Sequence, residues 1–147
     1  MIEISDITAC IWDDIKHFDD YINKCFADED LLLKEMTDYW FERKGKRIRP
    51  ILTLLVANML GKATDVTYRA AAVLELIHTA SLIHDDVLDA SPLRRGRSTI
   101  NNVWGNNSAV LLGDYIYGKC MELIVTEQDF DLMPAYSKVA IALPKGE

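Results

Sequence analysis

The chain has 147 residues, half of which are hydrophobic, and its 23 acidic residues outnumber its 16 lysines and arginines, giving a formal net charge of −7. This length suffices for one domain with a hydrophobic core, and so apolar a composition excludes a disordered chain. The acidic balance argues against a general nucleic-acid-binding protein, which presents a basic surface to its ligand. We therefore expect a single domain over residues 1–147.

Hydrophobic residues recur at helical spacing through the first part of the chain. The pattern predicts a helix from residue 5 to about residue 25 and a second helix over residues 31–41. Residues 43–49 read as a basic loop. Pro50 then suits the first turn of a third helix, which Gly61 ends.

A long helix is predicted in the middle of the chain. It opens at Thr64 or Asp65 and ends near Asp89, because Pro92 follows and the residue before a proline disfavours helical geometry.

The remaining sequence reads as an ordered loop over residues 93–105, followed by helices over residues 107–125 and 130–143. Because an alternating strand pattern is lacking throughout, we expect an all-α protein, an antiparallel helix bundle.

The sequence also bears on location. Its N-terminus is acidic and amphipathic, unlike a secretory signal peptide, and its longest apolar run, residues 51–60, is too short to be a transmembrane segment. Cys10, Cys25 and Cys120 are widely spaced and odd in number, so we expect reduced thiols. These features favour a soluble, cytoplasmic protein.

Three carboxylates, Asp85, Asp86 and Asp89, stand at the end of the long helix. Residues four apart share a helix face, so Asp85 and Asp89 project together while Asp86 is turned aside. Two carboxylates one turn apart can hold Mg²⁺, which takes waters and phosphate oxygens in its other positions. The alternative is a solvated acidic helix end, although the helix dipole disfavours negative charge there. The pattern therefore favours a compensating cation.

Half of the basic residues fall into two islands, one before the long helix and one after it. These eight residues are Arg43, Lys44, Lys46, Arg47, Arg49, Arg94, Arg95 and Arg97. The planar arginine fork suits phosphate oxygens, and Gly96 lets the backbone approach a ligand closely. The alternatives are ion pairs with the aspartates, which are compatible with a ligand-free site, and a solvated basic turn. The islands favour a local anionic ligand over a broad basic surface.

Two histidines lie on the same long helix. His78 is seven residues before Asp85, so it lies about two turns below it on the same face. It is either a site residue or a core or capping residue. His84 is expected to be structural.

Three ordered motifs at matching spacings make the chain resemble the trans-type polyprenyl diphosphate synthases. The motifs are Gly45-Lys46-Arg47-Ile48-Arg49-Pro50, the segment from Glu75 to Asp89, and Arg94-Arg95-Gly96, and Leu112-Gly113-Asp114-Tyr115 fits the helix that follows in that family. The resemblance covers the chain from about residue 40. It implies the N-terminal half of the isoprenoid synthase fold.

The resemblance also implies a prenyltransferase that adds isopentenyl diphosphate to an allylic prenyl diphosphate. By position in the motifs, isopentenyl diphosphate would bind at Lys46, Arg49, His78 and Arg95, the allylic diphosphate at Arg94, and Mg²⁺ at Asp85, Asp86 and Asp89. Metal and arginines would neutralise the leaving diphosphate, and an apolar pocket would keep water from the carbocation.

Small residues below the aspartates bear on product length. In the family, bulky aromatics four or five positions before the first aspartate stop chain growth early, whereas Ser81 and Ala80 stand there in this chain. The resemblance thus implies a longer-chain enzyme, with Ile77, Ala80 and Ser81 lining the product pocket. Alternatively, the small side chains only allow close helix packing.

Two departures from the family pattern stand out. Lys44 replaces one of the usual pair of glycines before Lys46, and the chain ends at Glu147, before the region of the family's second aspartate-rich motif. We expect half of a prenyltransferase that needs a second chain or segment. An inactive truncated synthase and a non-catalytic prenyl-diphosphate-binding or regulatory subunit remain alternatives. Apolar faces exposed on such a half predict a homo-oligomer or a heteromer with a complementary chain.

Overall fold

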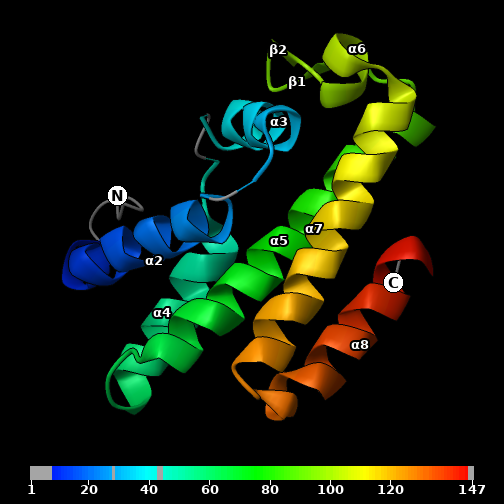
Figure 1. Ribbon diagram of the computed structural model, residues 1–147. Coiled ribbons are helices and arrows are strands. Elements are labelled where there is room, and N and C mark those ends of the chain that lie inside the picture. The colour runs from blue at the N-terminus through cyan, green and yellow to red at the C-terminus, as the bar shows by residue number, and fades with distance from the viewer. Residues whose placement is uncertain (1–7, 28, 43–44, 146–147) are drawn as a thin grey trace.

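The computed structural model describes residues 8–27, 29–42 and 45–145 of the chain. Helices make up most of this part, which confirms the all-α prediction (Figure 1). In chain order the elements are η1 (Ala9–Ile11), α2 (Trp12–Cys25), α3 (Leu31–Glu42), α4 (Ile48–Leu60), α5 (Asp65–Leu88), β1 (Leu93–Arg94), β2 (Arg97–Ser98), α6 (Ile100–Trp104), α7 (Asn106–Thr126), η2 (Phe130–Leu132), α8 (Met133–Ala142) and η3 (Leu143–Lys145).

The central element is α5, which α7 accompanies along its length while α4 and α2 pack on another side (Figure 1). Its fully buried positions include Ala71, Ala72, Leu76 and Ala80. The alanines let neighbouring helices approach closely, because interiors pack at the density of organic crystals. The long helix is therefore a rigid base from which its polar residues project.

Most predicted helix ends agree with the structure. α4 has Pro50 in its first turn and ends before Gly61, and Thr64 is the N-cap of α5. The backbone N–H of Thr64 donates to Oγ1 of Thr67 at 3.1 Å, which satisfies a donor at this helix start. For the first predicted helix, residues 5–7 lie outside the described part, and α2 itself begins at Trp12 after the turn η1.

The prediction of a loop over residues 93–105 was wrong. β1 and β2 form an antiparallel hairpin, with Leu93 opposite Ser98, and α6 follows directly. The turn residues Arg95 and Gly96 have φ angles of 52° and 75°, and positive φ at both central residues is what a type I′ hairpin turn requires. Strands of two residues are too short to show an alternating pattern, which is why the sequence did not reveal them.

Gly113 of α7 packs against His84 near the end of α5. It is buried, and a Cβ there would overlap the imidazole ring of His84. The His84 Nε2 atom lies 3.1 Å from the carbonyl oxygen of Val110 and 3.5 Å from Oδ1 of Asp114. This position at a helix contact agrees with the structural role predicted for His84.

Within the described part of the chain, no helix combines the length and hydropathy needed to cross a membrane.

Candidate functional site

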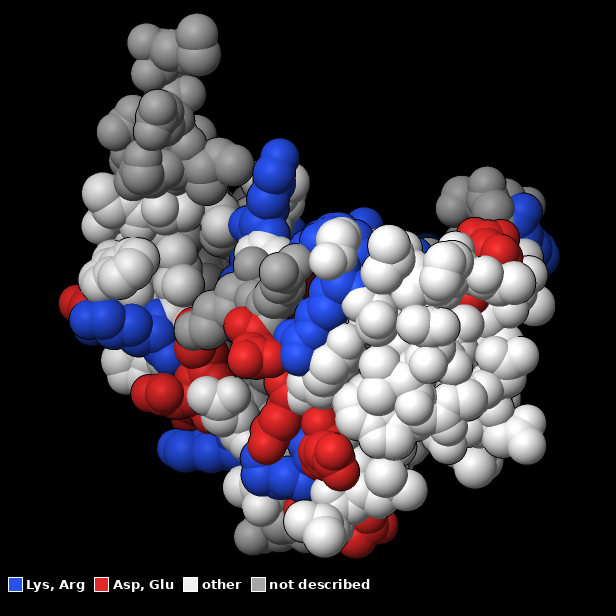
Figure 2. Space-filling view, turned by 90° about the horizontal axis from the view of Figure 1, so that it is seen from above, with Lys and Arg blue, Asp and Glu red and all other residues white. Residues whose placement is uncertain are grey.

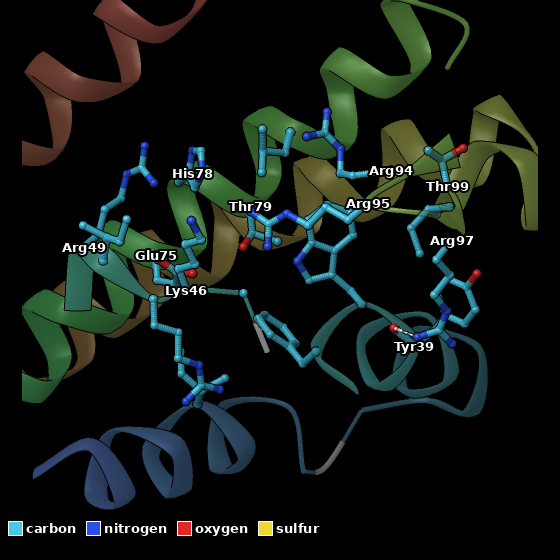
Figure 3. A pocket seen from close by; sticks show the side chains of 18 of the residues that line it. Tyr39, Lys46, Arg49, Glu75, His78, Thr79, Arg94, Arg95, Arg97 and Thr99 are labelled. Atoms are coloured by element: carbon cyan, nitrogen blue, oxygen red, sulfur yellow. Dashed lines mark hydrogen bonds between the residues drawn. The ribbon is translucent and has the colours of Figure 1, made fainter. Parts of the chain in front are cut away.

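A cavity of about 690 Å³ lies where α2, α3, the start of α4, α5 and the β1–β2 hairpin meet (Figure 3). Its apolar wall comes from Phe18 of α2 and from three aromatic residues at the end of α3, Tyr39, Trp40 and Phe41. Its polar wall comes from the basic segment before α4, one face of α5 and the hairpin. An apolar pocket with a few convergent polar groups is the usual form of a small-molecule site.

Five of the predicted site residues line this one cavity: Lys46, Arg49, His78, Arg94 and Arg95. They come from three separate segments, and Figure 3 shows Lys46, Arg49 and His78 on one side of the cavity with Arg94 and Arg95 on the other. The structure therefore brings the described residues of the two basic islands together, as an anion site requires, while Arg43 and Lys44 lie outside the described part of the chain.

The cavity carries a strong excess of positive charge. Among its described lining residues are six cations, which are Lys46, Arg47, Arg49, Arg94, Arg95 and Arg97, and one carboxylate, which is Glu75. Figure 2 shows basic side chains in the middle of one face, with acidic side chains next to them and a broad uncharged surface on the right. In a protein of net charge −7, such a concentration marks a place for an anion.

His78 is half-buried in this positive environment. Burial lowers its pKa below the ordinary value, and Arg49, Arg95 and Arg94 lower it further, while Asp85 acts in the opposite direction. The imidazole is therefore neutral near pH 7 and presents one N–H donor and one acceptor.

Glu75 is a cavity residue for which the sequence had suggested no role. It precedes His78 by three residues on α5, so both project from the same face. Burial raises the pKa of its carboxyl group, whereas Arg49, Arg47 and Arg95 lower it. Its helical spacing from His78 was the signal that could have revealed it.

Arg94 forms a fork with Asp86. The side chain of Asp86 is 3% exposed, the Arg94 Nε atom is 2.9 Å from both carboxylate oxygens, and Nη2 is 2.8 Å from Oδ1. These hydrogen bonds are the main cause of a raised Arg94 pKa. Arg94 and Asp86 thus form the ion pair that the sequence left open as an alternative to ligand binding. In this pair, Asp86 is turned away from the helix face of Asp85 and Asp89.

Asp85 and Asp89 are exposed at the end of α5, one helical turn apart, and the backbone N–H of Asp89 donates to the carbonyl of Asp85 at 2.8 Å. Neither lines the cavity. In the described part of the chain, no three carboxylate, histidine or cysteine groups converge as a metal site. Two exposed carboxylates nevertheless fit Mg²⁺, which is usually bound through one or two carboxylates together with substrate phosphates.

The three predicted product-pocket residues lie on the buried side of α5. Ile77 and Ala80 are 2% and 0% exposed in the hydrophobic core, and the Ser81 hydroxyl donates to the carbonyl of His78 at 2.8 Å. The described cavity is lined by none of them. Full burial of Ala80 agrees with the packing alternative, and their role in product length stays a prediction.

Two further basic residues are held by contacts that the sequence did not reveal. Arg47 pairs with Asp19 of α2 and lies over the ring of Phe18, 5.6 Å from its centroid, and burial lowers its pKa. Arg97 of β2 stacks on Tyr39 of α3, 3.4 Å from the ring centroid. Because these partners are far apart in sequence, no local pattern could connect them.

Comparison with known proteins gives the family and some close relatives. The polyprenyl synthetase family model matches residues 30–147. An all-trans-nonaprenyl-diphosphate synthase (geranyl-diphosphate specific) from Rhodobacter capsulatus is 37% identical over 144 residues, which are 97% of this chain and 44% of that protein. The octaprenyl diphosphate synthase of Escherichia coli is 35% identical over 116 residues, 79% of this chain and 36% of that protein.

Solved structures agree with these relatives. A decaprenyl diphosphate synthase from Rhodobacter capsulatus has a TM-score of 0.88 at 33% identity and covers 95% of this chain and 43% of its own. A polyprenyl synthase from Caulobacter crescentus, complexed with calcium and isoprenyl diphosphate, has a TM-score of 0.90 at 27% identity. This match covers 98% of the present chain and 44% of the Caulobacter chain. The chain thus spans less than half the length of these relatives. Because the family model covers most of it, the chain belongs to the polyprenyl synthetase family.

Proposed function

We propose that the cavity binds isopentenyl diphosphate through Lys46, Arg49, His78 and Arg95. The observation that carries this proposal is the convergence of these four side chains on one cavity with an aromatic wall. The other three cations of the cavity, Arg47, Arg94 and Arg97, pair with Asp19, Asp86 and Glu42. Arginine and lysine donate charge-assisted hydrogen bonds to phosphate oxygens, while the aromatic wall suits a short hydrocarbon. The Caulobacter crescentus relative was crystallised with calcium and isoprenyl diphosphate, which supports a ligand of this class.

The chain would form one wall of a prenyltransferase that adds this substrate to an allylic prenyl diphosphate. Arg94, held in place by Asp86, would contact the allylic diphosphate, and Asp85 and Asp89 would hold Mg²⁺. When bound, the metal would supply positive charge to the departing diphosphate. Tyr39, Trp40 and Phe41 would exclude water from the reacting carbons.

Activity would depend on a second polypeptide or segment, and the products would be of the longer-chain type. The basis for the first point is that the chain spans 44% and 36% of the two synthases compared above. The basis for the second is the small size of Ala80 and Ser81, together with the nonaprenyl and octaprenyl products in those relatives' names.

Binding is tested first, by titrating the chain with isopentenyl diphosphate in a calorimeter. Lys46→Met should lower the affinity by about tenfold or more, because a charge-assisted hydrogen bond to phosphate is lost. The matched control is Lys62→Met, since Lys62 is exposed and lies outside the cavity. Equal affinities in the two variants would contradict the assignment.

Turnover is tested by incorporation of radiolabelled isopentenyl diphosphate onto farnesyl or geranylgeranyl diphosphate with Mg²⁺, by this chain alone and with candidate partner chains. We expect turnover only in the presence of a partner, and its loss in Asp85→Ala. Tight binding without turnover in any combination would favour a non-catalytic binding subunit.

A further inference from the structure

The aromatic wall of the cavity is carried by α3, which lies at the edge of the bundle (Figure 1). Its first two residues, Leu31 and Leu32, are 86% and 49% exposed. The cavity residues are at its other end, where Tyr39, Trp40 and Phe41 precede the basic segment. How this end is held therefore decides where the aromatic wall lies relative to the hairpin.

Arg97 of β2 makes three contacts with the end of α3. Its guanidinium lies 3.4 Å from the centroid of the Tyr39 ring, its Nη1 donates to the Tyr39 carbonyl at 3.1 Å, and its Nη2 lies 2.7 Å from Oε2 of Glu42. The last four carbonyls of a helix lack partners within the helix, and Tyr39 provides one of them. A cation at that end also compensates the helix dipole and the charge of Glu42.

Tyr39 in turn contacts the hairpin. Its hydroxyl donates to the carbonyl of Ser98, the neighbour of Arg97, at 2.9 Å. Its ring also meets Trp104 of α6 edge to face, with centroids 5.0 Å apart. We call the reciprocal pair of Arg97 and Tyr39 the clasp.

The clasp joins the hairpin, which carries two of the cavity cations, to the helix that carries the aromatic wall. Arg94 and Arg95 belong to the same hairpin as Arg97, and Trp40 and Phe41 follow Tyr39 in α3. A fixed separation between the hairpin cations and this wall matters, because misplacing a binding group by about 1 Å can cost about a hundredfold in activity.

We propose that Arg97 and Tyr39 are positioning residues that hold the hairpin and its cations against the aromatic wall, and that Arg97 does not itself bind the diphosphate. This inference rests on the proposed function. The Nη1 and Nη2 atoms of Arg97 are directed to Tyr39 and Glu42, and the flat face of the guanidinium covers the Tyr39 ring. A lysine would keep the charge but could neither form the fork nor stack in the same way.

The test measures the affinity for inorganic diphosphate by calorimetry and the hydrogen exchange of α3 amides without ligand. Arg97→Lys and Tyr39→Leu should each weaken binding by about tenfold, and the double variant should lose no more than either, because residues that act as one unit are not additive. Both variants should speed exchange at the end of α3. Tyr39→Phe keeps the ring that Arg97 covers and loses only the hydroxyl bond to Ser98, so it should retain most of the affinity.

Lys34→Gln is the matched control, because Lys34 pairs with Asp38 on the exposed side of the same helix at 2.6 Å. It should change neither measurement. The positioning role would be contradicted if Arg97→Lys kept full affinity for diphosphate. It would also be contradicted if the losses of the two single variants multiplied in the double variant, or if hydrogen exchange of the α3 amides stayed unchanged. If the unaltered chain fails to bind diphosphate, the proposed function is overturned and the positioning role with it, an outcome distinct from failure of the variants alone.

Discussion

Burial and three neighbouring arginines both lower the pKa of His78, and this keeps its imidazole neutral. A diphosphate in the cavity would oppose the effect of the arginines, because its negative charge stabilises the imidazolium. The pKa of His78 would then be higher in the complex than in the free protein. Binding should therefore take up a proton.

This predicts a pH dependence with a definite sign. Affinity for isopentenyl diphosphate should fall as pH rises through the pKa of His78 in the complex, by up to about tenfold per pH unit for one linked proton. Calorimetry in buffers of different ionisation enthalpy measures the proton uptake directly. His78→Gln should abolish most of it, whereas His17→Gln, an exposed histidine on α2, should not. If proton uptake on binding is the same in His78→Gln as in the unaltered chain, a group other than His78 binds the proton.

The residues of the cavity were only partly predictable. Charge and motif spacing located Lys46, Arg49 and Arg95, because their basic islands are visible in the chain itself. The contact of Arg97 with Tyr39 was not predictable, since it depends on how a hairpin meets a helix end 58 residues away. Sequence patterns report local geometry and charge, and tertiary partners leave no such trace.

Among the elements, α5 and α7 were predictable because long helices repeat their hydrophobic pattern over many turns. Both were expected within a residue or two of their observed ends. The hairpin was hidden, because its strands have two residues each and its turn depends on the backbone of Arg95 and Gly96. Length thus decided which elements could be predicted.

The contact between α5 and α7 yields a prediction about stability. Gly113→Ala should lower the free energy of unfolding by about 1–3 kcal/mol, because the added methyl overlaps His84 in a packed interface. Gly118 lies on the same helix with nothing within 4 Å of an added Cβ. Gly118→Ala should therefore be neutral or stabilise by up to about 1 kcal/mol, as alanine favours helices.

Urea unfolding of the two variants measures this difference. Equal effects would mean that the α5–α7 contact relaxes without cost. Adding His84→Ala to Gly113→Ala should recover part of the loss, since it removes the atoms that the new methyl meets.

For the whole molecule, the exposed side of α4 is the notable surface. Ile48, Leu52, Val56 and Met59 recur at helical spacing and are 51%, 56%, 53% and 83% exposed. Contiguous apolar stripes of this kind mark interaction surfaces in proteins.

We therefore expect the purified chain, of 16.7 kDa, to sediment as an oligomer at micromolar concentration. Val56→Glu should shift it toward the monomer, because a charge on the stripe would have to be buried in the contact. Leu31→Glu, at an apolar and even more exposed position on α3, is the control and should leave the sedimentation unchanged. A stable monomer of the unaltered chain would contradict the prediction.

The hairpin turn has a consequence for how this family member can vary. Arg95 adopts a left-handed backbone, which costs a residue with a side chain about 1–2 kcal/mol, and its guanidinium lies against Gly45. Glycine at position 95 would relieve the strain but remove a cation from the cavity, and any larger residue at position 45 would displace that cation. At position 95, selection for a stable chain and selection for anion binding therefore favour different residues, and at position 45 only glycine leaves room for the cation.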